Sequence, residues 1–428
     1  MSNAPRSLGL FSVIAMVASL QLGFGIFILP SLLSPYGFWG ISSWLISGLG
    51  AIALCHVFSA LSAHPMVGGP HVYIEQAFGK RLGFYAGWTY WVLSWLASAP
   101  LVMCAVDSLK NLLHPWLAFN PLLVLILQCT VLWALMMLNI RGSQISGLGE
   151  RLLGVLKLLP LLLLPLISIP FWNMDLLMEP KAHPPMMSLS SASLITFWGF
   201  VGLEAGTTIV DCVENPKKTI PRALFFGTLL VLFTYIINTT SILSVVPGDI
   251  LMKTSNSYGA LLDRCCGTGW GKLIDLTIFL VCIGSLNSWI LASGYILASG
   301  AKSQIFPSFF GQTNRYNSPD TGIKLTATCL LLCVIIMHNE TLSKKIQIMI
   351  ELSTALYMGI YLLSVAALFY MIRHNRIQKK TLLMGSAFLS ALFCVWIIWS
   401  LSYPVILGSL LIPLIGYGFA RLFRWPVQ

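Results

Sequence analysis

Charged residues are scarce in this sequence, and their scarcity narrows the class of protein. Asp, Glu, Lys and Arg make up only 9% of the 428 residues, against 57% hydrophobic residues and a mean hydropathy of +0.83. The sequence has no polar stretch long enough for a soluble domain and no low-complexity linker. Because a soluble domain needs a polar, charged surface, this composition indicates an integral membrane protein.

Patterns for metal or redox chemistry are also missing. The ten cysteines are scattered, mostly within apolar segments, and form neither a Cys-x-x-Cys pair nor a His/Cys cluster with zinc spacing. No nucleophile, base and orienting residue stand in a recognisable catalytic pattern. We therefore expect no metal, no cofactor and no enzymatic activity.

Apolar runs of about 20 residues, enough to cross ~30 Å of hydrocarbon, recur along the whole chain. The first run has no small-residue cleavage site, so we interpret it as a spanning helix rather than a signal peptide. The predicted fold is a single all-α transmembrane domain over 1–428 with about twelve spans: 8–32, 40–62, 83–109, 121–139, 152–170, 189–212, 222–246, 270–300, 322–338, 346–372, 381–402 and 404–420.

Basic residues in the short loops predict the orientation. With the N-terminus inside, most of the 25 lysines and arginines fall on the inner side. Both termini are then cytoplasmic, and in a bacterium the membrane is the inner one. Basic loops that lie against anionic lipid explain the net charge of +11, so the charge does not call for nucleic acid as a partner.

Two apolar segments are interrupted by glycines. Gly23-Phe24-Gly25 interrupts the first, and Gly199 and Gly202 interrupt the segment 189–212. Lipid offers no hydrogen-bond partners, so irregular backbone at membrane depth is tolerated only where it is buried in protein or lines a water-filled cavity. Interrupted helices in corresponding halves predict the substrate site of a secondary transporter.

Three ionisable residues lie inside predicted spans, where a charge is costly and functional by default. Glu204 follows the second interruption, Lys157 lies in the fifth span, and Glu351 lies near the start of the tenth. The structural alternatives are bonding to freed backbone donors for Glu204, snorkelling to the inner surface for Lys157, and an exposed loop-end position for Glu351.

Two of the fourteen tryptophans stand apart from the usual interface anchors. Trp198 immediately precedes Gly199, and Trp289 lies mid-span among small residues. Each could line a substrate site. Tyr90, Trp91, Ser94 and Ser98 place polar groups on the third span, and helix packing is the alternative explanation for all of these residues.

A family resemblance rests on four segments that occur in order: LGFGIFILP, MVGGPHVYIEQAFGKRLGFYAGWTYW, LNIRG and FWGFVGLEAGTTIVDCVENPKKTIPRA. Together they resemble the amino acid–polyamine–organocation (APC) superfamily, and among its members the bacterial basic amino acid exchangers of the arginine/agmatine type. The resemblance covers about residues 8 to 330. It implies two inverted repeats of five helices, here 8–170 and 189–372, with helices 1 and 6 unwound, followed by two additional helices within 381–420.

The resemblance also implies a binding site. The substrate carboxylate would meet the backbone at Gly23, Phe24 and Gly25, and its amine would meet the carbonyls of Gln21, Trp198 and Val201. This agrees with the physics of opposed half-helices, whose N-terminal end attracts anions and whose freed carbonyls attract cations. The resemblance further places the substrate side chain near Ser94, Ser98 and Trp289, makes Trp198 a gating aromatic, and makes Glu204 a proton-sensitive carboxylate.

Two positions depart from the arginine/agmatine type. Phe24 replaces the usual small residue, which adds a large ring beside the carboxylate site. Lys157 stands where that type has a neutral residue and where sodium-coupled relatives hold their ion, so its ammonium could replace sodium or carry a proton.

We interpret the sequence as a secondary transporter that moves an amino acid, cationic or decarboxylated to its amine, by alternating access. Exchange is favoured, proton-coupled uptake of an amino acid or polyamine is the alternative, and a non-transporting sensor is a third hypothesis. The expected partners are the small-molecule substrate and the lipid bilayer. The oligomeric state is open, with a homodimer among the options.

Overall fold

The computed structural model describes residues 9–23, 25–62, 69–114, 116, 119–141, 147–178, 185–207, 213–254, 256–302, 304–316, 318–338 and 340–422. Within these ranges the chain is almost entirely helical and contains no β-strand. This agrees with the all-α expectation and with the rule that a membrane segment satisfies its backbone groups internally.

Eight of the twelve predicted spans are present as helices long and apolar enough to cross a membrane. They are α3 (Phe38–Ser62), α5 with α6 (Lys80–Leu96 and Ala99–Leu113), α7 (Pro121–Ile140), α11 (Pro216–Val245), α14 (Gly271–Lys302), α16 (Leu342–Arg373), α17 (Thr381–Trp399) and α18 (Tyr403–Leu422).

The other four predicted spans are not among these eight. The first becomes α1 (Leu10–Gln21) and α2 (Gly25–Leu33), the fifth is α8 (Gly147–Ser168), the sixth begins as α10 (Pro185–Trp198), and the ninth is α15 (Asp320–Ile336). α15 has 17 residues, fewer than the ~20 that cross the hydrocarbon core without help. The full set of twelve spans and the inverted repeat therefore stay predictions.

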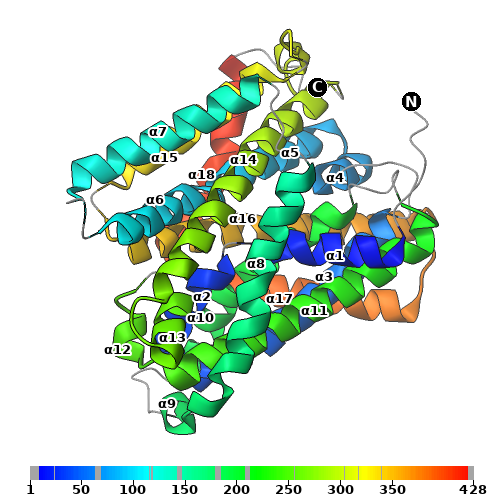
Figure 1. The fold of residues 1–428 in the computed structure, drawn as a ribbon. Coiled ribbons are helices and arrows are strands. Elements are labelled where there is room, and N and C mark those ends of the chain that lie inside the picture. Colours follow the sequence, from blue (N-terminus) through cyan, green and yellow to red (C-terminus); the bar gives the residue numbers. More distant parts are fainter. Residues whose placement is uncertain are drawn as a thin grey trace.

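Small helices connect the long ones. They are η1 (Ser34–Tyr36), α4 (Pro70–Phe78), η2 (Ile169–Phe171), α9 (Met174–Met178), η3 (Leu203–Thr207), α12 (Gly248–Leu251), α13 (Ser257–Cys266) and η5 (Ser308–Gly311). α3 and α11 pack against each other, with α1 on α11 and with α10 and α17 on α3, whereas α6, α7 and α15 pack with α14 (Figure 1).

The predicted third span, 83–109, is not continuous. α5 ends at Leu96 and α6 begins at Ala99, with a turn at Ala97 and Ser98 between them. The physical cause is Pro100, which stands in the first turn of α6 and has no N–H to donate to the carbonyl one turn earlier. The third predicted span is therefore present as one membrane-length segment, Lys80–Leu113, with a turn near its middle that hydropathy alone does not reveal.

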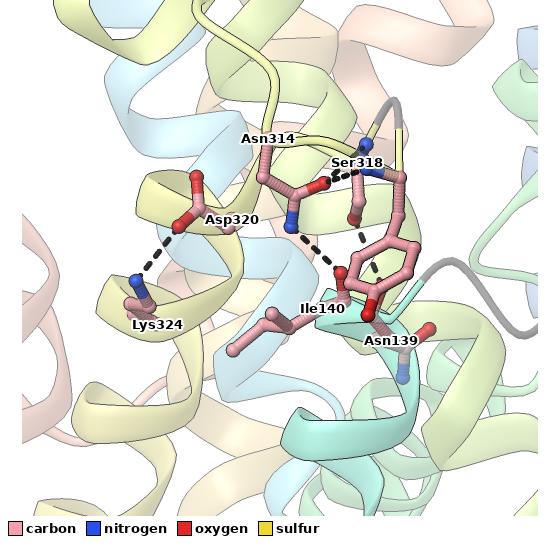
Figure 2. Close-up of polar contacts among 7 residues, drawn as sticks. Asn139, Ile140, Asn314, Ser318, Asp320 and Lys324 are labelled. Atoms are coloured by element: carbon pink, nitrogen blue, oxygen red, sulfur yellow. Dashed lines mark hydrogen bonds and ion pairs between the residues drawn. The ribbon is translucent and has the colours of Figure 1, made fainter.

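The C-terminal end of α7 is held by a loop that lies far away in the sequence (Figure 2). The last carbonyls of a helix lack intrahelical donors. Here Asn314 Nδ2 donates to the Ile140 carbonyl at 2.7 Å, and Ser318 Oγ donates to the Asn139 carbonyl at 2.8 Å. The Asn139 amide also donates to Asn287 Oδ1 of α14 at 2.9 Å. The asparagine of the LNIRG segment thus joins α7 to α14.

Candidate substrate and coupling site

The two helix interruptions lie side by side. The first separates α1 from α2, and the second separates α10 from η3. A Cβ atom built on Gly25 would fall 2.4 Å from Cζ3 of Trp198, so the indole lies directly against the first residue of α2. Only glycine permits this approach. The segments of the two halves that the sequence singled out therefore meet at one place.

Backbone hydrogen bonds at the first interruption are local. The Leu22 N–H donates to the Ala18 carbonyl and the Gly23 N–H to the Gln21 carbonyl, both at 2.8 Å. The Gln21 carbonyl also accepts the Tyr235 hydroxyl at 3.4 Å. The Gln21 side-chain amide donates to the Thr228 hydroxyl at 2.9 Å. The chain thus leaves α1 through a tight turn whose carbonyl group already holds two donors.

The second interruption is a tightened turn. The N–H groups of Gly199, Phe200 and Val201 donate to the carbonyls three residues earlier, at 3.0, 2.9 and 3.3 Å, and the Trp198 carbonyl accepts the last of them. Gly202 follows with φ +99°, a conformation that favours glycine. The helix therefore ends in a few 3₁₀-type bonds before Glu204.

Glu204 is buried in a cage of hydroxyl groups. The Tyr361 hydroxyl of α16 donates to Oε2 at 2.5 Å, and the Tyr90 hydroxyl of α5 donates to Oε1 at 3.3 Å. Thr207 donates to the Glu204 carbonyl at 2.6 Å, and Tyr73 of α4 lies 3.4 Å from the Thr207 oxygen. The tyrosine of the GGPHVY segment is thereby connected to the second interruption.

None of the ion pairs that the described residues form involves Glu204. A buried carboxylate without a cation needs hydrogen bonds or a proton to offset its desolvation. Two hydroxyl donors meet part of that need. The arrangement is suited to a carboxyl group that gains and loses a proton as its surroundings change.

Sequence reasoning missed Tyr361, and it identified Tyr90 as a polar group on the third span without connecting it to Glu204. Neither stands in a pattern that distinguishes it, since the chain has 13 tyrosines and both lie in apolar helices. The sequence could have indicated these two tyrosines only if the packing of α5 and α16 against the second interruption had been known.

Lys157 lies on α8 and is buried, with 8% of its surface exposed. Its ammonium donates to the Ser19 carbonyl at 3.0 Å and lies 3.5 Å from the Ser19 hydroxyl. Ser19 belongs to the last turn of α1, where helix carbonyls lack intrahelical donors and the helix dipole favours a cation. The lysine thus reaches the end of the first half-helix rather than the membrane surface.

Ser94 of α5 and Trp289 of α14 occupy facing helices, and Ser98 lies in the turn that follows α5. The Ser94 and Ser293 hydroxyls, on α5 and α14, are 2.7 Å apart, and Ser293 Oγ donates to the Trp289 carbonyl at 2.7 Å. Ser98 Oγ donates to the Ser94 carbonyl at 2.6 Å. The two predicted serines are buried, whereas the Trp289 side chain is half-buried.

Two further expectations have simple outcomes. Phe24 lies outside the described residues. Glu351 accepts a hydrogen bond from Gln347 one turn earlier in α16 at 2.8 Å and lies ten residues from Tyr361, about 15 Å along the helix axis. It therefore does not take part in the Glu204 cage. It is not at an exposed loop end either, because it is half-buried in the third turn of α16.

Comparison with known proteins agrees with this arrangement. Residues 8–413 match the model of the amino acid permease family. Over 98% of both chains, this chain is 27% identical to the putrescine transporter PotE of Haemophilus influenzae. It is 24% identical to an arginine/agmatine antiporter of Chlamydia pneumoniae, over 98% of this chain and 90% of the relative. It is 26% identical to a cadaverine/lysine antiporter of Escherichia coli, over 79% and 77%.

The family match confirms the resemblance that the sequence segments indicated, and the named relatives are bacterial transporters rather than enzymes. Membership of this family implies a small-molecule substrate, an amino acid or an amine, and a membrane setting. The described residues contain two adjacent helix interruptions and eight membrane-length helices, and the match over residues 8–413 shows that this multi-pass bacterial membrane protein belongs to the amino acid permease family of the APC superfamily.

Proposed function

We propose that this protein exchanges an amino acid for a related amine across the inner membrane by alternating access. The observation that carries the proposal is the contact of Trp198 with Gly25, because it brings together the two half-helix ends that can hold both charges of an amino acid. The similarity to two antiporters supports exchange over one-way uptake. The basic residues of the short loops predict that both termini are cytoplasmic.

The substrate backbone would lie between the interruptions. Its carboxylate would bind the amides at the start of α2, around Gly23 and Gly25, with Phe24 beside them. Its amine would bind the carbonyls of Gln21, Trp198 and Val201. In this structure the Gln21 and Trp198 carbonyls hold internal donors, so the substrate would replace these local bonds with its own.

The substrate side chain would extend between α5 and α14, toward Ser94, Ser98 and Trp289. The hydroxyl of Ser94 faces α14, and the indole of Trp289 is half-buried. An aromatic face with nearby hydroxyl groups suits an alkyl chain that ends in an amine or guanidinium group. The substrate class is therefore a cationic amino acid or its decarboxylated product.

Two buried ionisable groups would couple binding to movement. The Lys157 ammonium would replace a sodium ion by holding the end of α1 in one state and releasing it in the other. Glu204 would exchange a proton as the tyrosines of its cage separate. A proton taken up with the substrate by Glu204 is the specific feature that would favour the alternative, proton-coupled uptake.

Counterflow in proteoliposomes tests the proposal. Vesicles are loaded with one of lysine, cadaverine, arginine, agmatine or putrescine, and uptake of each labelled compound is measured. We expect rapid uptake only when the interior contains a substrate. Uptake that ignores the internal solute and follows an imposed pH gradient would instead establish a proton-coupled permease, and no uptake of any of the five would refute the proposed substrate class.

A further inference from the structure

An apolar groove lies away from the two interruptions, on the flank formed by α5, α15 and α18. Its volume is about 490 Å³, and its walls present no polar surface. The wall residues include Trp88, Trp91 and Trp95 of α5, Cys329 of α15 and Ile412 of α18. Pockets for small ligands span roughly 300–1,000 Å³ but carry a few polar groups that orient the ligand. A charged amino acid would lose its hydration here without replacement.

Hydrogen bonds hold the walls of this groove in place. Trp88 Nε1 donates to the Ile412 carbonyl at 2.9 Å, and Trp91 Nε1 donates to Thr326 Oγ1 at 3.1 Å. A Cβ atom on Gly416 would fall 2.6 Å from Trp88, so the indole lies flat on the backbone of α18. The tryptophans thus fix α5 to both α15 and α18, and the space between these contacts is a built feature rather than loose packing.

A cation stands on the same face of α5 as the groove. Arg81, Trp88 and Trp95 are spaced by seven residues, and residues at this spacing share one helix face. Arg81 is exposed in the first turn of α5. From Arg81 to Trp95 the helix rises about 21 Å, and one leaflet with its headgroups contributes about half of the ~40–45 Å bilayer. The groove begins at Trp88 on α5, so a positive charge stands about one leaflet away from its far end.

We propose that the groove binds one acyl chain of an anionic phospholipid whose phosphate pairs with Arg81. The lipid belongs to the leaflet at the Arg81 end, which the loop charges predict to be the inner one. Basic residues at this level attract anionic headgroups, and the apolar walls match an acyl chain. The helix that holds the lipid also carries Tyr90, which donates to Glu204, so the lipid contacts an element of the substrate and coupling site.

Native mass spectrometry on the purified protein tests the proposal directly. The protein is titrated with phosphatidylglycerol or with phosphatidylcholine of identical acyl chains. We expect one tightly retained phosphatidylglycerol per chain, bound about five- to tenfold more tightly than phosphatidylcholine, as one additional cation–headgroup contact implies. Binding needs no transport activity, so this test can fail while the proposed exchange function holds.

Two pairs of variants separate the acyl chain from the headgroup. Cys329→Trp fills the groove and should abolish the tight lipid, whereas Cys129→Trp on α7, outside the groove, should retain it. Arg81→Gln should bind both lipids equally, whereas Arg141→Gln at the end of α7 should keep the preference. Leu325→Trp fills the same groove and replaces Cys329→Trp if that variant does not fold.

Three results would overturn the proposal. The first is equal retention of both lipids by the unmodified protein. The second is unchanged retention of phosphatidylglycerol when the groove is filled. The third is an undiminished preference for phosphatidylglycerol in Arg81→Gln.

Discussion

The contact between Gly25 and Trp198 predicts a specific effect of one methyl group. In Gly25→Ala the new Cβ would lie 2.4 Å from the indole, whereas carbon atoms pack at about 3.5–4.0 Å. The indole must therefore retreat by roughly 1.1–1.6 Å. Overpacking of this kind costs about 1–3 kcal/mol, so we expect Gly25→Ala to destabilise this conformation by that amount.

Gly23→Ala is the matched control for this stability measurement. Among the described residues, a Cβ on Gly23 would meet only the Gly25 nitrogen, at 4.0 Å, so this substitution should leave the unfolding free energy nearly unchanged. Denaturant titration in mixed micelles compares the two variants. The cost of Gly25→Ala arises from the indole, so Trp198→Phe, with its smaller ring, should relieve it.

A double-mutant cycle completes the test, because residues in contact give non-additive effects. The loss of unfolding free energy caused by Gly25→Ala should be smaller by at least about 1 kcal/mol in the Trp198→Phe background than in the unmodified protein. If the two changes are additive, the indole does not press on α2, and the contact that supports the substrate site is refuted.

Four further predictions concern individual side chains. Glu204→Gln should flatten the pH dependence of uptake in proteoliposomes, and Tyr361→Phe, which removes a hydrogen bond of about 1.5–3 kcal/mol to a charged group, should shift it; unchanged profiles in both variants would contradict a titrating role. Lys157→Ala should slow transport far more than it weakens substrate binding, and exchange of sodium for choline should leave the unmodified protein unaffected; strict sodium dependence would disprove the replacement. Trp289→Ala should weaken substrate binding by ~1–3 kcal/mol in calorimetry, and unaltered affinity would leave Trp289 as a packing residue. Burial lowers the pKa of His71 to about 4, so the neutral ring contributes stability above about pH 6.5 that is lost as the pH falls toward 4; His71→Gln should show a smaller loss of thermal stability over this range, and identical losses would refute the reasoning.

Features that depend on the period and composition of the sequence were predictable. Apolar length predicted eight spans that the structure contains, and glycines in apolar runs predicted both helix interruptions. Lys157 and Glu204 were identified as unusual because a charge inside an apolar run is costly. Each of these predictions needs only the local sequence.

Features that depend on which helices face each other were not predictable in this way. Tyr361 lies 157 residues from Glu204 in the sequence, and an apolar helix with several tyrosines does not reveal which one points toward a carboxylate. The turn at Ala97 and Ser98 was a different kind of omission. Pro100 was visible in the sequence, but hydropathy alone continued the helix through it.

The hydrogen bonds that Asn314 and Ser318 donate to the end of α7 have a consequence for the synthesis of the chain. Asn314 follows Ile140 by 174 residues, so at ~5–20 residues per second the ribosome adds it roughly 9 to 35 s later. During that interval the Ile140 and Asn139 carbonyls lack the donors that complete them, and α7 waits in the membrane with an unfinished end. Biogenesis therefore has a late step that no earlier helix can replace. A nascent chain released before Asn314 and Ser318 are added would lack both of these donors at the end of α7.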